Sequence, residues 1–470
     1  MQYQAGAAVR DITPPPELLA AKKIWLWGYG NRTSPCVGVH SRLSARALAI
    51  RDQDDNTVVL VALDTGMLAP EMTARVRARA TQAFAIPPEN ICINVSHTHG
   101  APVTVSTPTW QLGAALAQTE YVAFFETQVS RVIEDALNRL QPAQLAWARG
   151  NTQIGRDRHF RGELRFYDST LDVLAVSSAC PKPAARSDGR TAIATVFIAP
   201  CHPVCNAELN KIYSDFPGVA REAVELELGG TAFFLQGYSG TCVPDLVDGQ
   251  KATETQTGQR LAVDVIAVAR GPKHKLEGPL SAALHSLDLP LQPVDPAALP
   301  SIRRWADTIR AAKPDLAEVV VRWTDHLAAL APPWPRWLPT QQQAVRIGTA
   351  PNECYVVASS HEVSMDFGPR IRALWPSPRV SVIGYSNAQL SYLPSARVMT
   401  NPYAANDFPR DIANYNYTGA VSFLWYAHPG PLAIEADDMF VNGFRSLAER
   451  EPPPYGPKAT AHPFRAELQI

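Results

Sequence analysis

Two histidines two residues apart, His97 and His99, are the strongest candidates for chemistry in this sequence. They follow the apolar segment Ile91–Val95. Side chains at positions i and i+2 of extended backbone point the same way, so both histidines can reach one metal ion or one substrate. The alternative is a pair of surface or capping histidines, because histidine is often simply a hydrogen-bonded residue. The location directly after an apolar strand favours the functional interpretation.

Another histidine, His202, lies in the run Cys201–Cys205, immediately after the apolar segment Ala192–Ala199. Taken alone, this run could be half of a cysteine/histidine zinc site. No second half with CxxC spacing follows, which argues against a structural zinc finger. His202 at a strand end is therefore the better candidate ligand, with the two cysteines as small buried neighbours.

A third polar group is the pair His361-Glu362, which Tyr392 follows further along the chain. A carboxylate from Glu362 would complete a set of two histidines and one glutamate. That set is a catalytic zinc pattern, which leaves an open position for water. The alternative is an exposed His-Glu pair at the start of a helix, where the helix dipole favours glutamate.

The segments around these groups alternate between strand and helix patterns. The predicted strands are Arg46–Asp52, Thr57–Asp64, Asn90–Ser96, Ala192–Ala199, Thr231–Gln236, Leu280–Pro290, Ala344–Ser359 and Val380–Tyr385. The predicted helices are Pro70–Phe84, Tyr121–Leu140, Pro217–Leu228, Ile302–Leu330 and Asp437–Arg450. This order predicts an α/β fold with a mixed β-sheet layered with helices. In such folds ligands bind beyond the strand ends, where the three polar groups lie.

The same pattern predicts one large catalytic domain over residues 1–450, with a helical insertion at about 300–335. A Pro-rich C-terminal tail at 451–470 follows the last predicted helix. Prolines cluster at several places and divide the chain into loops and element ends. No obvious internal repeat is present.

Charge and cysteine content narrow the class of protein. The net charge of −1 gives no general attraction to nucleic acid or to anionic membranes. No uncharged apolar run reaches the ~18–20 residues of a membrane span. The first residues show no signal-peptide pattern, and the seven cysteines are scattered and odd in number. We therefore expect a cytoplasmic protein with reduced thiols. A homo-oligomer is compatible with this composition.

Several short motifs follow one another in a fixed order from about residue 5 to 450. They are Gly6–Pro14, Gly28–Gly30, Gly38–His40, Ala45–Ala47, Ser96–Gly100, Gly155–Arg158, Cys201–Pro203, Ser214–Gly218, Phe234–Gly237, His361–Glu362 and Tyr392–Pro394. Each motif alone has low specificity, but their order and spacing together are specific. In this series the chain resembles the catalytic domain of the neutral/alkaline non-lysosomal ceramidases.

The resemblance implies site residues and a cofactor. In that family the second histidine of the His-Thr-His motif, here His99, faces the scissile carbonyl. The family's key arginine falls on Arg158, which would bind or polarise the substrate oxygen. Tyr403 falls near a second family tyrosine that hydrogen-bonds at the reaction centre. One zinc ion per chain is expected, with His97, His202, Glu362 and Tyr392 as its ligands.

Elementary chemistry agrees with these roles. Zinc lowers the pKa of a bound water from about 15.7 to about 7. Histidine and arginine donors stabilise the oxyanion of a tetrahedral intermediate by roughly 3 to 4 kcal/mol each. Asp64 and Asp215 are candidates to orient the ligand histidines from behind, and buried capping roles are an equal alternative for both.

The chain departs from the family pattern after Phe234–Gly237. Val243 occupies the position of a family serine, and valine can neither attack a carbonyl nor donate a hydrogen bond. This excludes a serine-dependent step there, but it leaves a zinc-activated water. His361 and Asp157 also replace the family's usual residues, so we expect a substrate smaller or more polar than ceramide. The candidate pocket residues are Tyr238, Ser239, Thr241 and His361, although Ser239 and Thr241 could merely satisfy turn backbone.

The leading functional hypothesis is a zinc amidohydrolase that acts on an N-acyl compound, either a small molecule or a lipid-like substrate. A zinc esterase or lactonase on the same site is the nearest alternative. A non-catalytic relative that binds a ligand is the alternative from a different class. Loss of the serine favours that last hypothesis, and retention of all four ligand positions argues against it.

Overall fold

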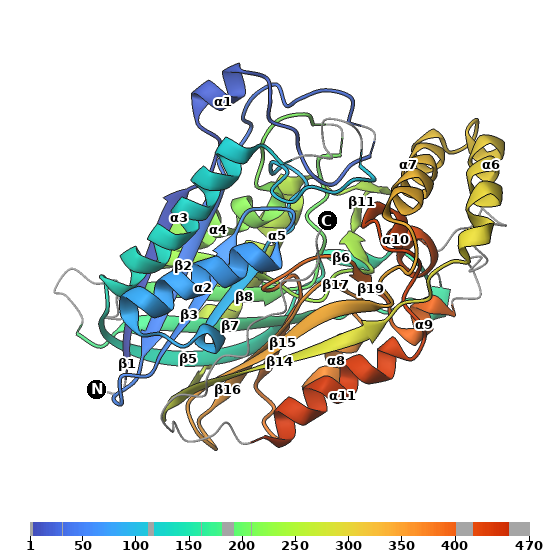
Figure 1. Cartoon of the computed structure of the whole chain (residues 1–470). Coiled ribbons are helices and arrows are strands. Elements are labelled where there is room, and N and C mark those ends of the chain that lie inside the picture. Colours follow the sequence, from blue (N-terminus) through green and yellow to red (C-terminus); the bar gives the residue numbers. More distant parts are fainter. Residues whose placement is uncertain are drawn as a thin grey trace.

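The computed structural model describes residues 3–30, 32–110, 117–160, 162–180, 192–207, 209–400 and 417–450. Two β-sheets pack face to face, and helices cover the outer side of each sheet (Figure 1). This arrangement confirms the predicted α/β fold with a mixed sheet layered with helices. The predicted Pro-rich tail at 451–470 lies outside the described residues.

The first sheet is mixed in strand direction. β3 pairs in parallel with β4, and β8 with β9, whereas its other pairings are antiparallel. Every residue of β3 and β4 is buried, as expected for parallel strands that are covered on both faces. The strand order is β4 (Ile91–Val95), β3 (Thr57–Leu63), β2 (Ser44–Arg51), β1 (Tyr3–Asp11), β5 (Gln141–Asn151), β7 (Thr170–Ser178), β8 (Ala192–Ala199) and β9 (Thr231–Gln236), with β13 (His274–Lys275) beside β5.

The second sheet has the order β14 (Leu280–Pro290), β15 (Trp337–Ile347), β16 (Cys354–Ser359) and β18 (Val380–Ile383). β16 and β18 are parallel, and the other two pairings are antiparallel. The segment predicted as one strand region, Ala344–Ser359, is therefore the end of β15, a turn, and β16. Apolar residues of both sheets meet in one buried cluster, so the sheets share a core.

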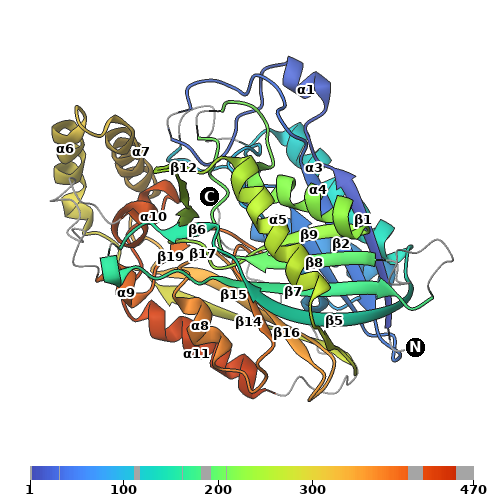
Figure 2. The same cartoon turned by 180° about the vertical axis from the view of Figure 1, so that it is seen from behind.

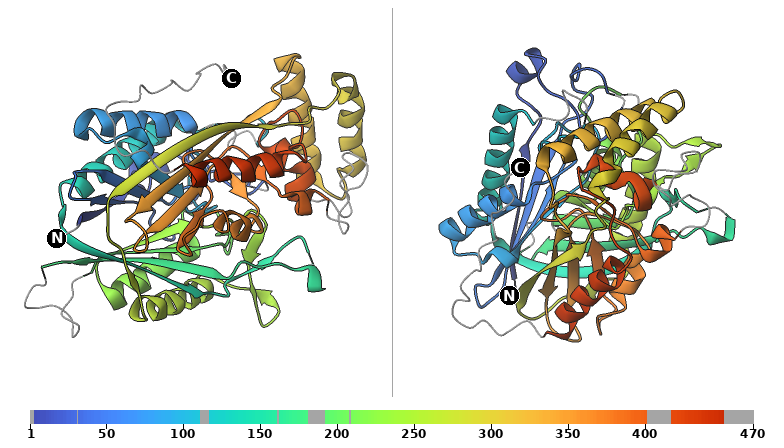
Figure 3. Two further views of the ribbon diagram at one scale, coloured as in Figure 1. Left: turned by 90° about the horizontal axis from the view of Figure 1, so that it is seen from below. Right: turned by 45° about the vertical axis from the view of Figure 1, so that its right-hand side comes forward.

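Helices lie on the outer faces. α2 (Pro70–Phe84) and α3 (Thr119–Leu137) cover the half of the first sheet that contains β4 to β1. α4 (Asp215–Leu228) and α5 (Glu254–Arg270) cover the half that contains β7 to β9 (Figure 2). α8 (Phe367–Arg372) and α11 (Ala436–Glu449) cover the second sheet (Figure 3). Among the described residues, no helix is both long enough and apolar enough to cross a bilayer.

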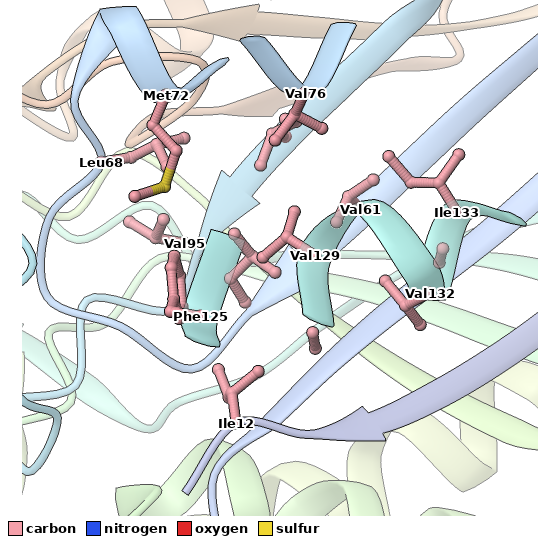
Figure 4. Close-up of a cluster of buried hydrophobic side chains, with 14 of the residues drawn as sticks. Ile12, Val61, Leu68, Met72, Val76, Val95, Phe125, Val129, Val132 and Ile133 are labelled. Carbon is pink, nitrogen blue, oxygen red and sulfur yellow. The ribbon is translucent and has the colours of Figure 1, made fainter. Parts of the chain in front are cut away.

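The stripe of apolar residues on α3 explains why this helix binds the sheet. Phe125, Val129 and Ile133 recur at helical spacing and are at most 1% exposed. They point at Val61 of β3 and, with α2, close one apolar cluster (Figure 4).

Shortening one side chain of this stripe tests its packing. Ile133→Val is expected to lower the free energy of unfolding by about 0.5–1.5 kcal/mol, because one buried methyl is replaced by a small cavity. The matched control is Leu226→Ala on α4, where the side chain is 87% exposed and the change is expected to stay within about 0.5 kcal/mol. Urea unfolding measures both, and equal effects would contradict this account.

The predicted helical region Ile302–Leu330 consists of two helices, α6 (Leu299–Ile309) and α7 (Pro314–Leu330). Pro314 begins α7, which is a position where proline loses no intrahelical hydrogen bond. The helices lie between β14 and β15 in the chain and project at one end of the molecule, beside α10 (Ser422–Trp425) (Figure 1).

The shorter elements are α1 (Pro16–Ala20), β6 (Gly155–Asp157), β10 (Cys242–Pro244), β11 (Leu246–Val247), β12 (Gln250–Lys251), β17 (Glu362–Val363), β19 (Tyr392–Leu393), α9 (Ala396–Met399), a π-helix (Tyr417–Val421) and 3₁₀ turns at Pro88–Asn90, Gly162–Leu164 and Pro296–Ala298.

The two sheets are joined where parallel strands end. Asn94 of β4 donates a side-chain hydrogen bond to the Gly384 carbonyl, just after β18, at 2.7 Å. The backbone amide of Gln236, the last residue of β9, donates to the Asn94 side chain at 2.8 Å. The carboxyl ends of β4, β9 and β18 therefore meet, and side chains that follow these strands are brought together.

Candidate metal centre

Three side chains from distant parts of the chain converge beyond these strand ends. His97 follows β4, His202 follows β8, and Glu362 follows β16. The Oε2 atom of Glu362 lies 3.3 Å from Nε2 of His97 and 3.2 Å from Nε2 of His202. Each of the three residues is 1% exposed. The structure thus brings together three of the four predicted metal ligands around one buried point.

Backbone carbonyls hold the two histidines from behind. Nδ1 of His97 lies 2.6 Å from the Gly66 carbonyl, and Nδ1 of His202 lies 3.0 Å from the Ser239 carbonyl. A carbonyl can only accept, so each neutral ring carries its proton on Nδ1 and turns the lone pair of Nε2 toward Glu362. This is the tautomer that ligates a metal through Nε2.

The charges of the cluster suit a cation. Burial lowers the pKa of His202 to about 4, although the neighbouring Glu362 carboxylate works in the other direction. Burial would raise the pKa of Glu362, but His97 and His202 outweigh it and hold that pKa well below its ordinary value. The Oε2 atom of Glu362 is nevertheless buried without a hydrogen-bond partner. Two imidazole lone pairs and an unsatisfied carboxylate oxygen directed at one point fit a metal ion.

The second predicted histidine, His99, belongs to the same cluster. Its Nε2 lies 3.4 Å from Nε2 of His97, and one nitrogen from each of His97, His99 and His202 falls within 4.8 Å of the others. The ring of Tyr29 packs edge-on against His99 at 4.6 Å between centroids. Burial, together with His97 and His202, holds the pKa of His99 well below its ordinary value, so the ring is neutral.

Tyr392 completes the predicted ligand set from β19. β17 and β19 are parallel, with Glu362 directly opposite Tyr392. The Tyr392 hydroxyl lies 3.5 Å from Nε2 of His202. The guanidinium of Arg158 lies 5.3 Å from the centre of the Tyr392 ring, and its Nη2 donates to the Gly240 carbonyl at 2.6 Å. The predicted tyrosine and arginine thus border the cluster, whereas Tyr403 lies outside the described residues.

The predicted role of Asp64 and Asp215 in orienting the histidines gains no support from the described contacts, because none of them joins either carboxylate to a histidine. Asp64 accepts two hydrogen bonds from Arg221, at 2.8 and 2.6 Å, and two more from Ser44. Asp215 accepts from the backbone amides of Cys205 and Phe216, and burial raises its pKa to about 6. The contacts of Asp64 and Asp215 fit the alternative that the sequence left open, in which both carboxylates have buried structural roles. The orienting groups are the two carbonyls.

The four predicted pocket residues are all buried, and none of them is among the residues that line the cavity beside the cluster. His361 and Glu362 are neither exposed nor at a helix start, which rules out that alternative for the pair. Nε2 of His361 lies 3.1 Å from the Thr340 hydroxyl, and burial lowers the His361 pKa to about 3. The remaining contacts are Tyr238 hydroxyl to Ser359, Thr241 hydroxyl to the Met365 amide, and Ser239 hydroxyl to Tyr385 and Gln236.

Three residues of the site were not predicted. Tyr385 follows β18, and its hydroxyl lies 3.4 Å from Nδ1 of His202. Gln389 and Tyr426 both contact the other oxygen of Glu362, Oε1. The rule that polar residues after apolar strands are candidates would have included Tyr385. No sequence signal marks Gln389 or Tyr426, because their contact with Glu362 depends on how distant loops fold together.

A cavity of about 470 Å³ lies beside the cluster. Tyr29, which packs on His99, lines one part of it, and Tyr417, which packs on Tyr392 at 5.5 Å between ring centroids, lines another. Trp110 and Trp425 add further aromatic surface, and the connection between α6 and α7 closes the outer side. A cavity with aromatic side chains in its wall and polar groups beside it is a common form of small-molecule site.

The fold and these side chains define an α/β protein with a buried histidine–carboxylate centre. Residues 3–158 match the family model described as neutral/alkaline non-lysosomal ceramidase, N-terminal. The neutral ceramidase of Drosophila pseudoobscura pseudoobscura is 36% identical over 104 residues, or 21% of this chain and 14% of that protein. Neutral ceramidase B of Dictyostelium discoideum is 28% identical over 184 residues, or 36% of this chain and 25% of that protein.

The crystal structure of neutral ceramidase from Pseudomonas aeruginosa superimposes with a TM-score of 0.69 at 20% identity. The superposition covers 98% of this chain and 77% of that one, and it shows that the folds are alike. The sequence matches span only about one seventh to one quarter of the Drosophila and Dictyostelium proteins. The family model, the homologues and the fold together support a relationship of this chain to the neutral/alkaline non-lysosomal ceramidase family.

Proposed function

We propose that this chain is a zinc-dependent hydrolase that cleaves the amide bond of an N-acyl, lipid-like or smaller substrate. The observation that carries the proposal is the buried, unsatisfied Oε2 of Glu362, which faces Nε2 of both His97 and His202. Similarity to neutral ceramidases supports the amide as the scissile bond.

His97, His202, Glu362 and Tyr392 would hold one zinc ion per chain. When bound, zinc acts as a Lewis acid that polarises a carbonyl and lowers the pKa of water. The described contacts fit the binding of such an ion. Glu362 and the neutral histidines supply the negative charge and the lone pairs, and the Gly66 and Ser239 carbonyls keep both rings in the ligating tautomer.

His99 and Arg158 are suited to act on the substrate oxygen. Nδ1 of His99 is buried without a hydrogen-bond partner, and so is Nε of Arg158. Donors placed where negative charge develops contribute roughly 3 to 4 kcal/mol each to transition-state stabilisation. We expect His99 to bind the carbonyl oxygen and Arg158 to supply positive charge next to Tyr392.

Water, rather than a side chain, is the expected nucleophile. Val243 stands on β10, paired with Arg156 of β6, and a valine offers no nucleophilic atom. The cavity would receive the part of the substrate that does not react, because its lining residues Tyr29 and Tyr417 pack on His99 and Tyr392. Its aromatic side chains can pack against an apolar group, and Lys313 and Asp315 also line it.

Metal analysis combined with a substrate panel tests the proposal. Elemental analysis of the purified chain is expected to find about one zinc per chain. N-acyl sphingosine, short N-acyl p-nitroanilides, p-nitrophenyl esters and acyl lactones are then assayed before and after removal of metal with EDTA. Chelator-sensitive cleavage of an amide supports the proposal. Cleavage of esters or lactones alone would favour an esterase or lactonase, and a well-folded chain that binds no zinc when zinc is supplied would leave a ligand-binding relative.

Gly28 offers a test of how closely His99 must be positioned. Its φ is +100°, and an added Cβ would lie 2.2 Å from Cγ of His99. Gly28→Ala is therefore expected to displace the His99 ring and to lower kcat/KM by about 100-fold. The control is Gly38→Ala, which has φ of +152° and nothing within 4 Å of the added Cβ. It shares the backbone strain without the collision, so an equal loss in both variants would argue against the positioning of His99.

A further inference from the structure

Glu362 has two carboxylate oxygens in different surroundings. Oε1 accepts a hydrogen bond from Nε2 of Gln389 at 2.9 Å and another from the hydroxyl of Tyr426. Oε2 has no hydrogen-bond donor and faces the two histidines. The carboxylate is therefore divided into a fixed oxygen and a free oxygen.

The two donors also bind each other, so the arrangement is closed. Nε2 of Gln389 lies 2.7 Å from the Tyr426 hydroxyl. An ionised carboxylate only accepts, and the hydroxyl gives its single proton to Glu362. The Gln389 side chain must then direct its NH₂ group toward both Oε1 of Glu362 and the Tyr426 hydroxyl oxygen. One N–H donates to each of these two oxygens. If either donor rotated away, the buried charged oxygen would lose one of its two hydrogen bonds.

The surrounding fold fixes both donors. Gln389 is fully buried, and its backbone amide donates to the Leu68 carbonyl at 3.0 Å, next to α2. The Tyr426 ring packs against the rings of Trp27 and Tyr392. The two donors thus come from separate loops and approach Oε1 from rigid positions.

We infer that Gln389 and Tyr426 are positioning residues that restrict Glu362 to binding the metal through one oxygen. This inference rests on the proposed metal function of the site. A carboxylate can ligate through one oxygen or through both. If Oε1 also bound the metal, both of its hydrogen bonds would have to break. The negative charge of the carboxylate strengthens each of these bonds, so binding through both oxygens is unfavourable. The centre then keeps a position open for water or substrate, as catalytic zinc sites require.

Cobalt(II) reports directly on this restriction, because its visible absorption becomes weaker as the number of ligands rises from four to five or six. The test compares the Co²⁺-loaded wild-type chain with Gln389→Leu, Tyr426→Phe and the double variant, and zinc affinity is measured by competition with a chelator. The matched control is Tyr121→Phe. The side chain of Tyr121 is fully buried in the core of the first sheet, and its hydroxyl donates to the Ile12 carbonyl at 2.9 Å.

The double variant is expected to show weaker Co²⁺ absorption bands than the wild type, with smaller changes in each single variant. Its zinc affinity is expected to fall about 10- to 100-fold, the usual effect of losing the groups that orient a metal ligand. Tyr121→Phe should change neither quantity. Thermal unfolding of the metal-free proteins identifies any variant that fails to fold.

Two results would overturn the inference while leaving the proposed function intact. The first is a double variant with the wild-type cobalt spectrum and zinc affinity. The second is a lower affinity with an unchanged spectrum, since Oε1 would then not have been released. A wild type that binds neither metal would overturn the proposed function itself, and this inference with it.

Discussion

Replacing both His97 and His202 by alanine is expected to remove the metal from the purified protein and to abolish chelator-sensitive hydrolysis. The two rings supply two of the four proposed ligands, and their Nε2 atoms lie 3.3 and 3.2 Å from Oε2 of Glu362. The loss should exceed the roughly 10- to 100-fold effect of residues that only orient a ligand. Elemental analysis and kcat/KM measure the two effects.

The control for this double variant is His274→Ala with His285→Ala. These two rings are partly exposed and lie far from the cluster in the chain, on β13 and β14. Metal content and activity are expected to match the wild type, which separates the loss of the site from the loss of any two imidazoles. A His97/His202 double variant that retained its metal would place the ion elsewhere in the protein and contradict the assignment.

Asp64→Ala is expected to lower the free energy of unfolding by about 3–5 kcal/mol, because it leaves the buried charge of Arg221 without its partner. The side chain of Asp64 is fully buried and that of Arg221 is 4% exposed, and they form two hydrogen bonds, with Nη2 of Arg221 at 2.6 Å from Oδ2 of Asp64. Asp64 also accepts the backbone amide of Ser44. Urea unfolding measures the loss.

The variant that replaces both partners, Asp64→Leu with Arg221→Met, separates pairing from burial. It removes both charges, so it is expected to be much more stable than Asp64→Ala alone. Metal affinity measured on folded protein should be close to that of the wild type for both variants, since Asp64 contacts neither histidine. A specific loss of metal affinity in Asp64→Ala would instead restore the role in orienting the histidines that the structure argues against.

The convergence of His97, His202 and Glu362 could be predicted from the sequence because each of them follows an apolar strand. β4, β8 and β16 are short, buried runs, and such runs are visible without a structure. The reason first given for the His97/His99 pair was nevertheless wrong. The backbone there is not extended, because β4 ends at Val95 and His97 has φ of +63°. The two rings meet at a turn in a left-handed conformation, which no periodicity predicts.

Other features could not be predicted because they depend on tertiary packing. Four of the nine residues of β1 are alanine or glycine, which have low strand propensity, and the segment is a strand because it pairs with β2 and β5. The carboxylates Asp64 and Asp215 looked suited to orient histidines, but the fold places Arg221 next to one and backbone amides next to the other. The groups that contact Nδ1 of the two histidines are backbone carbonyls. Because every residue has a carbonyl, the sequence cannot mark which ones take this role.

The distribution of the ligands along the chain couples metal binding to the completion of folding. The segment that matches the family model, residues 3–158, contains His97 but neither His202 nor Glu362. The carboxylate joins the histidines only after the second sheet has packed on the first. An ion that needs all of these groups binds the finished fold and no partly folded chain, and by mass action it stabilises that fold against every earlier state. During synthesis the ion would therefore enter last, and its uptake would mark a chain whose two sheets have closed.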